Sequence, residues 1–269
     1  MKELAFVQAF MRLAEDAWLK GWHERNGGNY SYRLKKEEVL QTRPYVDENK
    51  PWIAIATTVE NLANEYFFVT GSGKFMRNVP IDVEDSCALV KLDEQGEHYK
   101  IVWGLKNGGS PTSEFASHLM SHSVKLAQDC NYRFIMHAHP ANMIALSFVL
   151  PLDEVTFTRE LWEMATECPV VFPNGVGVIP WRVPGSVAIG VETSAQMKEH
   201  DVVLWAHHGV FCAGPSFDLT FGLMDTVEKS AEILVKVLSM GGKKQTITAD
   251  NFKELAPAFG ITLPEKYTN

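Results

Sequence analysis

Apolar residues near the start of the chain recur every three or four positions, which is the spacing of one face of a helix. Polar side chains such as Glu3, Gln8 and Arg12 lie between them. The pattern predicts an amphipathic helix that ends near Lys20. Its expected inward-facing side chains are Phe6, Phe10, Leu13, Ala14, Ala17 and Trp18.

Further along the chain, short apolar runs bounded by turn residues predict strands, and runs with helical spacing predict helices. Strands are expected at residues 30–34, 65–70, 87–92, 100–105, 134–136, 169–172 and 177–179, and in the run that starts at Val202. Helices are expected at residues 114–128, with Thr112 or Ser113 as N-cap, and at 141–149, 158–164, 191–198 and 219–240. Residues 35–64 have no clear pattern.

Strands and helices are therefore intermixed over the whole length. This order predicts an α/β fold in which helices cover both faces of a sheet. No Ser/Gly-rich, Pro-rich or like-charge tract divides the 269 residues, and no internal repeat is present. We expect one domain, residues 1–269.

Composition excludes several classes of function. A net charge of −8, with scattered lysines and arginines, gives no footprint for DNA or RNA. The cysteines form no CxxC pair, so neither a disulfide framework nor a sulfur-rich zinc knuckle is expected. The N-terminus lacks a signal-peptide core, and the most apolar stretch, residues 134–150, is too short and polar to span a bilayer. These features predict a soluble, cytoplasmic protein.

Histidines at the ends of two apolar runs are the main candidates for chemistry. His137 and His139 are two residues apart, so a strand would project both imidazoles from one face. A second apolar run ends in His207, His208 and Gly209. A single histidine of this kind is commonly structural. Three neutral imidazoles from two strand ends would instead make a zinc site with one open position, as catalytic sites require.

Three polar loops accompany the histidines. Residues 26–29 (Asn-Gly-Gly-Asn), 70–73 (Thr-Gly-Ser-Gly) and 111–114 (Pro-Thr-Ser-Glu) combine close backbone approach, hydroxyls, and amides at a helix N-terminus. Such groups suit a phosphate. Each loop alone is an ordinary turn or cap, so the phosphate interpretation depends on their occurrence together with the histidines.

Glu114 begins the helix expected at residues 114–128. An acidic residue there can simply complement the helix dipole, or it can act as a general base beside a metal. His118 and His122 share its helical face and are rival metal ligands. Their spacing lacks the HExxH pattern of zinc sites on helices, which favours the histidines at the strand ends.

The three loops, the His137-Ala-His139 pair and His208-Gly209, in this order, resemble the class II aldolase/adducin family over nearly the whole chain. The resemblance implies a three-layer α/β/α sandwich with a largely antiparallel central sheet, assembled as a ring-shaped homotetramer. It also implies one Zn²⁺ per subunit, held by His137, His139 and His208, with His207 structural.

The same resemblance assigns the other roles. It implies that the substrate is a sugar phosphate and that its phosphate is held by Asn26, Asn29, Ser72, Gly73, Thr112 and Ser113. Glu114 would be the catalytic carboxylate, and Glu167 would complete the site of a neighbouring subunit. The implied activity is that of a lyase, a metal-dependent aldolase that releases dihydroxyacetone phosphate.

Other classes of protein remain alternatives at this point. A zinc hydrolase could use the same imidazoles and Glu114, but it would not need three anion-binding loops. A non-catalytic interaction module should have lost ligands or base, whereas every motif position is filled here. A phosphopentose 4-epimerase of the same family would use a similar site. An all-imidazole site also accepts Co²⁺ or Mn²⁺.

Overall fold

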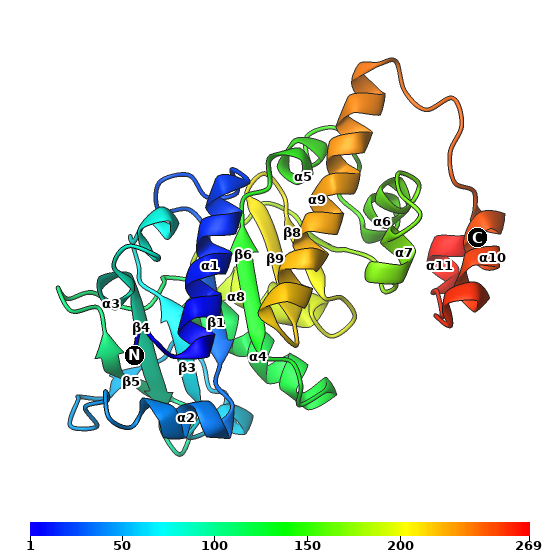
Figure 1. The fold of residues 1–269 in the computed structure, drawn as a ribbon. Coiled ribbons are helices and arrows are strands. Elements are labelled where there is room, and N and C mark those ends of the chain that lie inside the picture. Colours follow the sequence, from blue (N-terminus) through cyan, green and yellow to red (C-terminus); the bar gives the residue numbers. More distant parts are fainter.

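One sheet of nine strands forms the centre of the protein, as a computed structural model of residues 1–269 shows (Figure 1). The strand order is β2-β5-β4-β3-β1-β6-β9-β8-β7. Only β7 and β8 pair in parallel, and all other neighbours are antiparallel. The strands are β1 (Asn29–Arg33), β2 (Ile53–Ala54), β3 (Tyr66–Thr70), β4 (Cys87–Leu92), β5 (His98–Gly104), β6 (Phe134–Ala138), β7 (Gly177–Ile179), β8 (Val202–Trp205) and β9 (Gly209–Gly214). The predicted α/β class with a largely antiparallel sheet is confirmed.

Helices cover both faces of this sheet. The α-helices are α1 (Ala5–Leu19), α2 (Lys36–Thr42), α3 (Val83–Ser86), α4 (Phe115–Gln128), α5 (Ala141–Leu146), α6 (Glu154–Trp162), α7 (Cys168–Val171), α8 (Val187–Gln196), α9 (Phe217–Ser239), α10 (Ala249–Phe259) and α11 (Glu265–Thr268). Two 3₁₀ turns are η1 (Glu60–Leu62) and η2 (Met76–Asn78). None of the helices combines the length and the apolar character that crossing a membrane requires.

The alternation of side chains along β6 shows how the two faces are used. Phe134, Met136 and Ala138 join the large core under α1 and α9, whereas Ile135 packs on the opposite face with residues of α8. Helices α1 and α9 cross one face, while α4 and α8 pack together on the other (Figure 1). His137 has the parity of Ile135 and therefore faces the layer that contains α4.

Strand pairing brings the first polar loop to the histidines. In the antiparallel pair of β1 and β6, Asn29 lies opposite His137. The loop at residues 26–29 leads directly into β1, so it ends beside the last residues of β6. Asn29 and His137, which are more than a hundred residues apart in the sequence, therefore lie side by side at one end of the sheet.

Several local predictions are wrong. Residues 169–172 were expected as a strand, but α7 occupies this stretch, with Pro169 in its first turn, where proline is well tolerated. Trp18 is 39% exposed rather than inward-facing. The strand β9 was not predicted, and residues 35–64 contain α2, β2 and η1.

The N-cap of α4 also differs from the prediction. Glu114, not Thr112 or Ser113, is the N-cap, and its side chain makes no capping bond. The Thr112 hydroxyl instead accepts a long hydrogen bond of 3.3 Å from the backbone N–H of Glu114. The carboxylate of Glu114 is therefore free to point away from its own helix.

Candidate metal centre and active site

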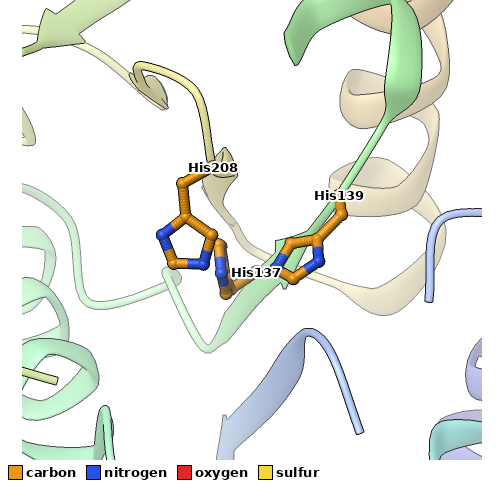
Figure 2. Close-up of side chains that lie close together, drawn as sticks. All are labelled: His137, His139 and His208. Atoms are coloured by element: carbon orange, nitrogen blue, oxygen red, sulfur yellow. The ribbon is translucent and has the colours of Figure 1, made fainter. Parts of the chain in front are cut away.

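Three histidines from distant parts of the chain meet at the end of the sheet. His137 is on β6, His139 follows the end of that strand, and His208 lies in the turn between β8 and β9. One nitrogen of each ring lies within 4.8 Å of the corresponding nitrogen of the other two. The rings surround a common point in Figure 2.

Hydrogen bonds fix the orientation of two of these rings. Nδ1 of His137 is 3.1 Å from the carbonyl oxygen of Val210, and Nδ1 of His139 is 2.7 Å from the Glu24 carboxylate. Both partners are acceptors, so each Nδ1 carries the proton and each Nε2 is left with a free lone pair. Nε2 of both rings is buried without any hydrogen-bond partner. Two neighbouring Nε2 atoms that carry no proton and have no hydrogen-bond partner are suitable ligands for a metal ion.

Burial keeps the rings of His137 and His208 uncharged. It lowers the pKa of His137 well below the usual value, with further lowering from the neighbouring His139 and His208. Burial also lowers the pKa of His208 to about 4. Neutral imidazole is the form that binds metals, so near neutral pH no proton has to leave His137 or His208 before an ion is bound.

The turn between β8 and β9 places His208 and turns His207 away. His207 has a left-handed backbone with φ of 63°, and its Nδ1 lies 3.0 Å from the Ser147 hydroxyl. Its ring packs against Phe148 in a tilted arrangement, with ring centroids 4.2 Å apart. Gly209 follows, and a Cβ there would lie 2.5 Å from the carbonyl oxygen of Ala138 and 2.8 Å from the His139 ring. Close approach of this turn to β6 therefore requires glycine.

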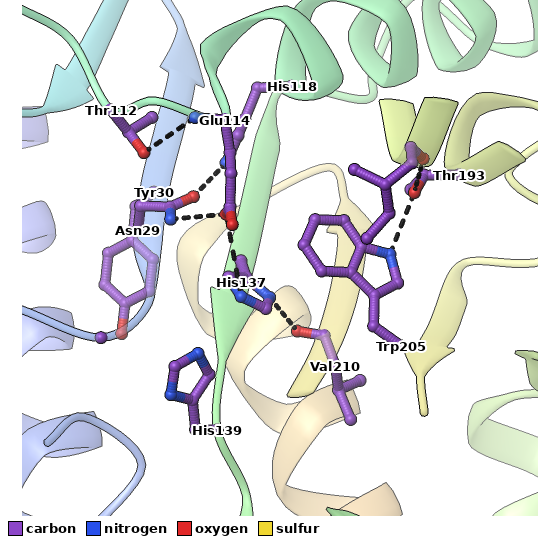
Figure 3. Close-up of polar contacts among 12 residues, drawn as sticks. Asn29, Tyr30, Thr112, Glu114, His118, His137, His139, Thr193, Trp205 and Val210 are labelled. Atoms are coloured by element: carbon purple, nitrogen blue, oxygen red, sulfur yellow. Dashed lines mark hydrogen bonds and ion pairs between the residues drawn. The ribbon is translucent and has the colours of Figure 1, made fainter. Parts of the chain in front are cut away.

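Glu114 is the buried carboxylate beside the histidines. Its Oε2 lies 3.7 Å from Nε2 of His137 and accepts a hydrogen bond of 2.7 Å from Nδ2 of Asn29 (Figure 3). Burial raises the pKa of Glu114 to about 7, although the bond from Asn29 acts in the opposite direction. A carboxylate with a pKa near neutrality suits a general base.

A polar pocket of about 200 Å³ joins the carboxylate, the histidines and the three loops. It has no hydrophobic lining residue; its walls are Asn26, Gly27, Gly28, Asn29, Gly71, Ser72, Gly73, Thr112, Ser113, Glu114, His137, His139 and His208. Every predicted site residue except Glu167 lines this pocket. Backbone bonds hold two of the loops together, since the N–H of Ser72 donates to Ser110 and the N–H of Thr112 donates to Thr70.

The buried side of the loop at residues 26–29 is held by His23, which the sequence analysis did not identify as a site residue. His23 is buried, with Nδ1 3.0 Å from the carbonyl oxygen of Gly27 and Nε2 bonded to the Tyr30 hydroxyl. Gly28 has φ of 76°, and a Cβ there would overlap the His23 ring. Glu24, which orients His139, was also missed. No spacing in the sequence pairs it with a residue 115 positions away.

Glu167 lies elsewhere. It is the exposed N-cap of α7 and lines a separate cavity of about 680 Å³, together with Lys20 and Glu228. Within a single chain, the structure does not bring it to the histidines. Its role at a neighbouring subunit stays a prediction.

His118 and His122, the rival ligands, are fully or almost fully buried on α4. Nδ1 of His118 and Nε2 of His122 both contact the hydroxyl of Ser31, at 2.6 Å and 2.8 Å. They therefore belong to a hydrogen-bonded group behind Glu114, and the group of convergent nitrogens consists of His137, His139 and His208.

Comparison with known proteins gives consistent matches. A family model described as Class II Aldolase and Adducin N-terminal domain matches residues 8–235. The rhamnulose-1-phosphate aldolase of Mannheimia succiniciproducens is 56% identical over 258 residues, 96% of this chain and 95% of that protein. The enzyme of the same name from Pectobacterium atrosepticum is 53% identical over 261 residues, 96% and 94% of the two chains. Among solved structures, a sugar-phosphate aldolase from Thermotoga maritima has a TM-score of 0.76 at 30% identity, covering 88% of this chain and 97% of that one.

Proposed function

The chain belongs to the class II aldolase and adducin family, and we propose that it is a zinc-dependent aldolase that reversibly cleaves L-rhamnulose 1-phosphate. The products are dihydroxyacetone phosphate and L-lactaldehyde, as a step in L-rhamnose degradation. It is a class II aldolase, and hence a lyase. Identity above 50% to rhamnulose-1-phosphate aldolases over nearly the full length supports the substrate.

The observation that carries the proposal is the site itself. Two unpartnered Nε2 atoms, a third imidazole and a buried carboxylate share one polar pocket. We propose that His137, His139 and His208 bind the ion. No lysine lines the pocket, and Lys74 of the adjacent loop is paired with Asp85 at 2.8 Å. A Schiff-base mechanism therefore has no candidate amine here.

Glu114 supplies the proton transfer in the proposed mechanism. A metal ion held by His137, His139 and His208 would supply Lewis acidity toward the substrate carbonyl. In the direction of synthesis, Glu114 removes a proton from the carbon beside the carbonyl of dihydroxyacetone phosphate. In the direction of cleavage it returns that proton, and Asn29 holds the carboxylate in place throughout.

The three loops would hold the substrate phosphate. Asn26, Ser72 and Ser113 are exposed to the pocket and can donate hydrogen bonds. Gly73 contributes backbone, and Thr112 a hydroxyl. Asn29 uses one amide hydrogen for Glu114, which leaves its second for the substrate. Because the pocket contains no hydrophobic side chain, it suits the charged end of the substrate.

We further propose a cytoplasmic homotetramer with sites at subunit interfaces. The pocket of one subunit has no hydrophobic lining residue, so it offers no apolar surface for the methyl group of the aldehyde. This supports an arrangement in which a second subunit completes the site. A neighbouring subunit would supply that surface and Glu167, which is exposed on its own subunit.

An assay of dihydroxyacetone phosphate released from L-rhamnulose 1-phosphate, with and without a chelator, tests the function. We expect release that the chelator abolishes and that Zn²⁺ restores. Restoration with Co²⁺ and Mn²⁺ in parallel identifies the preferred ion. Cleavage that persists after complete metal removal would contradict the mechanism.

Analysis of the products separates the aldolase from an epimerase of the same family. Two three-carbon fragments are expected from L-rhamnulose 1-phosphate. A phosphopentose that isomerises without fragmentation would instead identify a 4-epimerase.

A further inference from the structure

A line of buried polar side chains runs from Glu114 into the interior between the sheet and α4. Nδ2 of Asn29 donates to Glu114 at 2.7 Å, and Oδ1 of Asn29 contacts Nε2 of His118 at 2.5 Å (Figure 3). Nδ1 of His118 contacts the Ser31 hydroxyl at 2.6 Å, and that hydroxyl contacts Nε2 of His122 at 2.8 Å. Strand β1 supplies Asn29 and Ser31, and α4 with its N-cap supplies Glu114, His118 and His122.

Water cannot substitute for the three inner members of this line. Ser31 and His118 have no exposed surface, and His122 is 2% exposed. A polar atom left without a partner at such a position loses its full solvation. Each hydrogen of these three side chains that lies on the line must therefore meet an acceptor.

The ionised carboxylate at one end assigns every hydrogen. Oε2 of Glu114 can only accept, so Asn29 must present its N–H and keep its carbonyl oxygen toward His118. That oxygen needs a donor, so Nε2 of His118 carries the ring proton. Burial lowers the pKa of His118 to about 3, hence the ring is neutral and its Nδ1 accepts from Ser31. Nε2 of His122 then donates to Ser31.

We propose that His118 is a positioning residue for the catalytic carboxylate, which it controls by fixing which end of the Asn29 amide faces Glu114. This inference rests on the proposed function of Glu114 as the base. Without a donor at Nε2 of His118, the Asn29 amide loses one of the two contacts that hold it in this orientation, and only the carboxylate itself still selects its N–H. The reversed amide would place a carbonyl oxygen against the carboxylate and repel it.

Two substitutions at residue 118 separate positioning from packing. In His118→Gln, the amide nitrogen can take the position of Nε2 and donate to Asn29. In His118→Asn, the shorter amide reaches only the position of Nδ1, so the bond to Ser31 is kept and the bond to Asn29 is lost. His200→Gln is a control for removal of a buried imidazole, because His200 is 1% exposed and binds Glu154 and Asn174 away from the pocket.

The measurement is the exchange of the hydrogen on the hydroxyl-bearing carbon of dihydroxyacetone phosphate with D₂O, together with zinc content and melting temperature. We expect His118→Asn to slow exchange about 10- to 100-fold, because the bond from Asn29 to the charged Glu114, which the lost contact supports, is worth about that much. His118→Gln should restore the rate to within about threefold of the parent, because a donor to Asn29 returns. His200→Gln should leave the rate unchanged. Zinc content should be the same in all.

Equal rates for the Gln and Asn variants, fast or slow, would overturn the inference. Slow exchange in both, in proportion to lowered melting temperatures, would mean that the imidazole only fills space. Absence of exchange in the parent enzyme would contradict the proposed function instead, so the two failures are distinguishable.

Nitrogen NMR of histidine-labelled parent protein gives a test that needs no variant. With Glu114 present as the carboxylate, His118 should be the Nε2–H tautomer, with an unprotonated Nδ1. The Nδ1–H tautomer under those conditions would overturn the inference even if every variant failed to fold.

Discussion

Glu114 and His137 lie 3.7 Å apart, and burial acts on them in opposite directions. It raises the pKa of the carboxyl to about 7 and lowers that of the imidazole well below its usual range. At neutral pH this contact is therefore not a pair of full charges. A bound cation would favour the ionised carboxylate and pull the pKa of Glu114 down again.

Glu114→Gln separates metal binding from proton transfer. The amide has the shape of the carboxyl group but cannot accept the proton, so deuterium exchange into dihydroxyacetone phosphate should fall by about 10²- to 10⁴-fold. Zinc content, measured by atomic emission, should match the parent protein. A variant that exchanges at the parent rate would show that another group is the base.

His139→Ala tests the ligand set. It removes one nitrogen of the three and leaves the Glu24 carboxylate without its partner, so metal and activity should be lost together. His207→Ala is the matched control, because its ring is bonded to Ser147 and faces away from the cluster. It should retain zinc. Full zinc content in purified His139→Ala would refute the assignment.

At the scale of elements, the turn between β8 and β9 determines where His208 lies. Gly209→Ala would place a methyl group 2.5 Å from the carbonyl oxygen of Ala138 and 3.0 Å from the His137 ring. Because two strands meet there, the backbone has to shift and carry ligands with it. We expect zinc affinity to fall by about 10- to 100-fold, as for other changes that misorient ligands.

Gly222→Ala is the control for that change. Gly222 lies within α9, and a Cβ there would contact nothing within 4 Å. It should leave zinc affinity unchanged and stabilise the helix by about 0.5–1 kcal/mol. Competition with a chromophoric chelator measures both affinities. Equal zinc affinity in the two glycine variants would show that the turn tolerates the extra carbon.

At the scale of the molecule, buried histidines should make the metal-free protein sensitive to acid. Burial lowers the pKa of His23 and His118 from 6.5 to about 3. Below pH 6.5 the unfolded chain binds more protons than the folded one, so stability falls as the pH drops toward 3. At pH 5 each of the two should cost about 2 kcal/mol.

The raised pKa of Glu114 has the opposite effect on stability. Between about pH 4.5 and 7 the folded protein binds more protons at this group than the unfolded chain does, so this contribution to stability grows as the pH falls. Two carboxyls with a raised pKa, Glu114 and Glu228, oppose five histidines, since burial also lowers the pKa values of His122, His137 and His208. Urea unfolding of metal-free protein should therefore show a clearly lower midpoint at pH 5 than at pH 7.5. Equal midpoints would mean that these rings are protonated in the folded state.

Subunit mixing tests whether Glu167 acts on a neighbour. Glu114→Gln and Glu167→Ala should each be nearly inactive alone. If the proteins are refolded together, a site that combines Glu114 of one subunit with Glu167 of the next should recover part of the parent activity. Mixing two samples of the same variant is the control. No recovery in mixed tetramers would place Glu167 outside the neighbour's site.

Patterns within one element were predictable from the sequence. The helix at residues 114–128, strand β4 and the parity of His137 and His139 depend on a fixed local repeat of 3.6 or 2 residues. The motif loops were predictable for the same reason, since glycine and hydroxyl residues act through their own backbone. The strand predicted at residues 169–172 was wrong because Val170 and Val171 have a preference for strands. The stretch is nevertheless helical, and Pro169 is tolerated there because proline costs little in the first turn of a helix.

The pairing of elements was decided only by the tertiary structure. Neighbouring positions of β1 and β6 in the sheet bring Asn29 to His137, and the packing of α4 on that sheet brings His118 to Asn29, 89 residues away. The sequence alone determined which groups can bind a metal, accept a proton or hold a phosphate, because these are properties of side chains and local backbone. Burial, the raised pKa of Glu114 and the line of hydrogen bonds behind it depend on which distant segments exclude water from one another, and no local repeat encodes that.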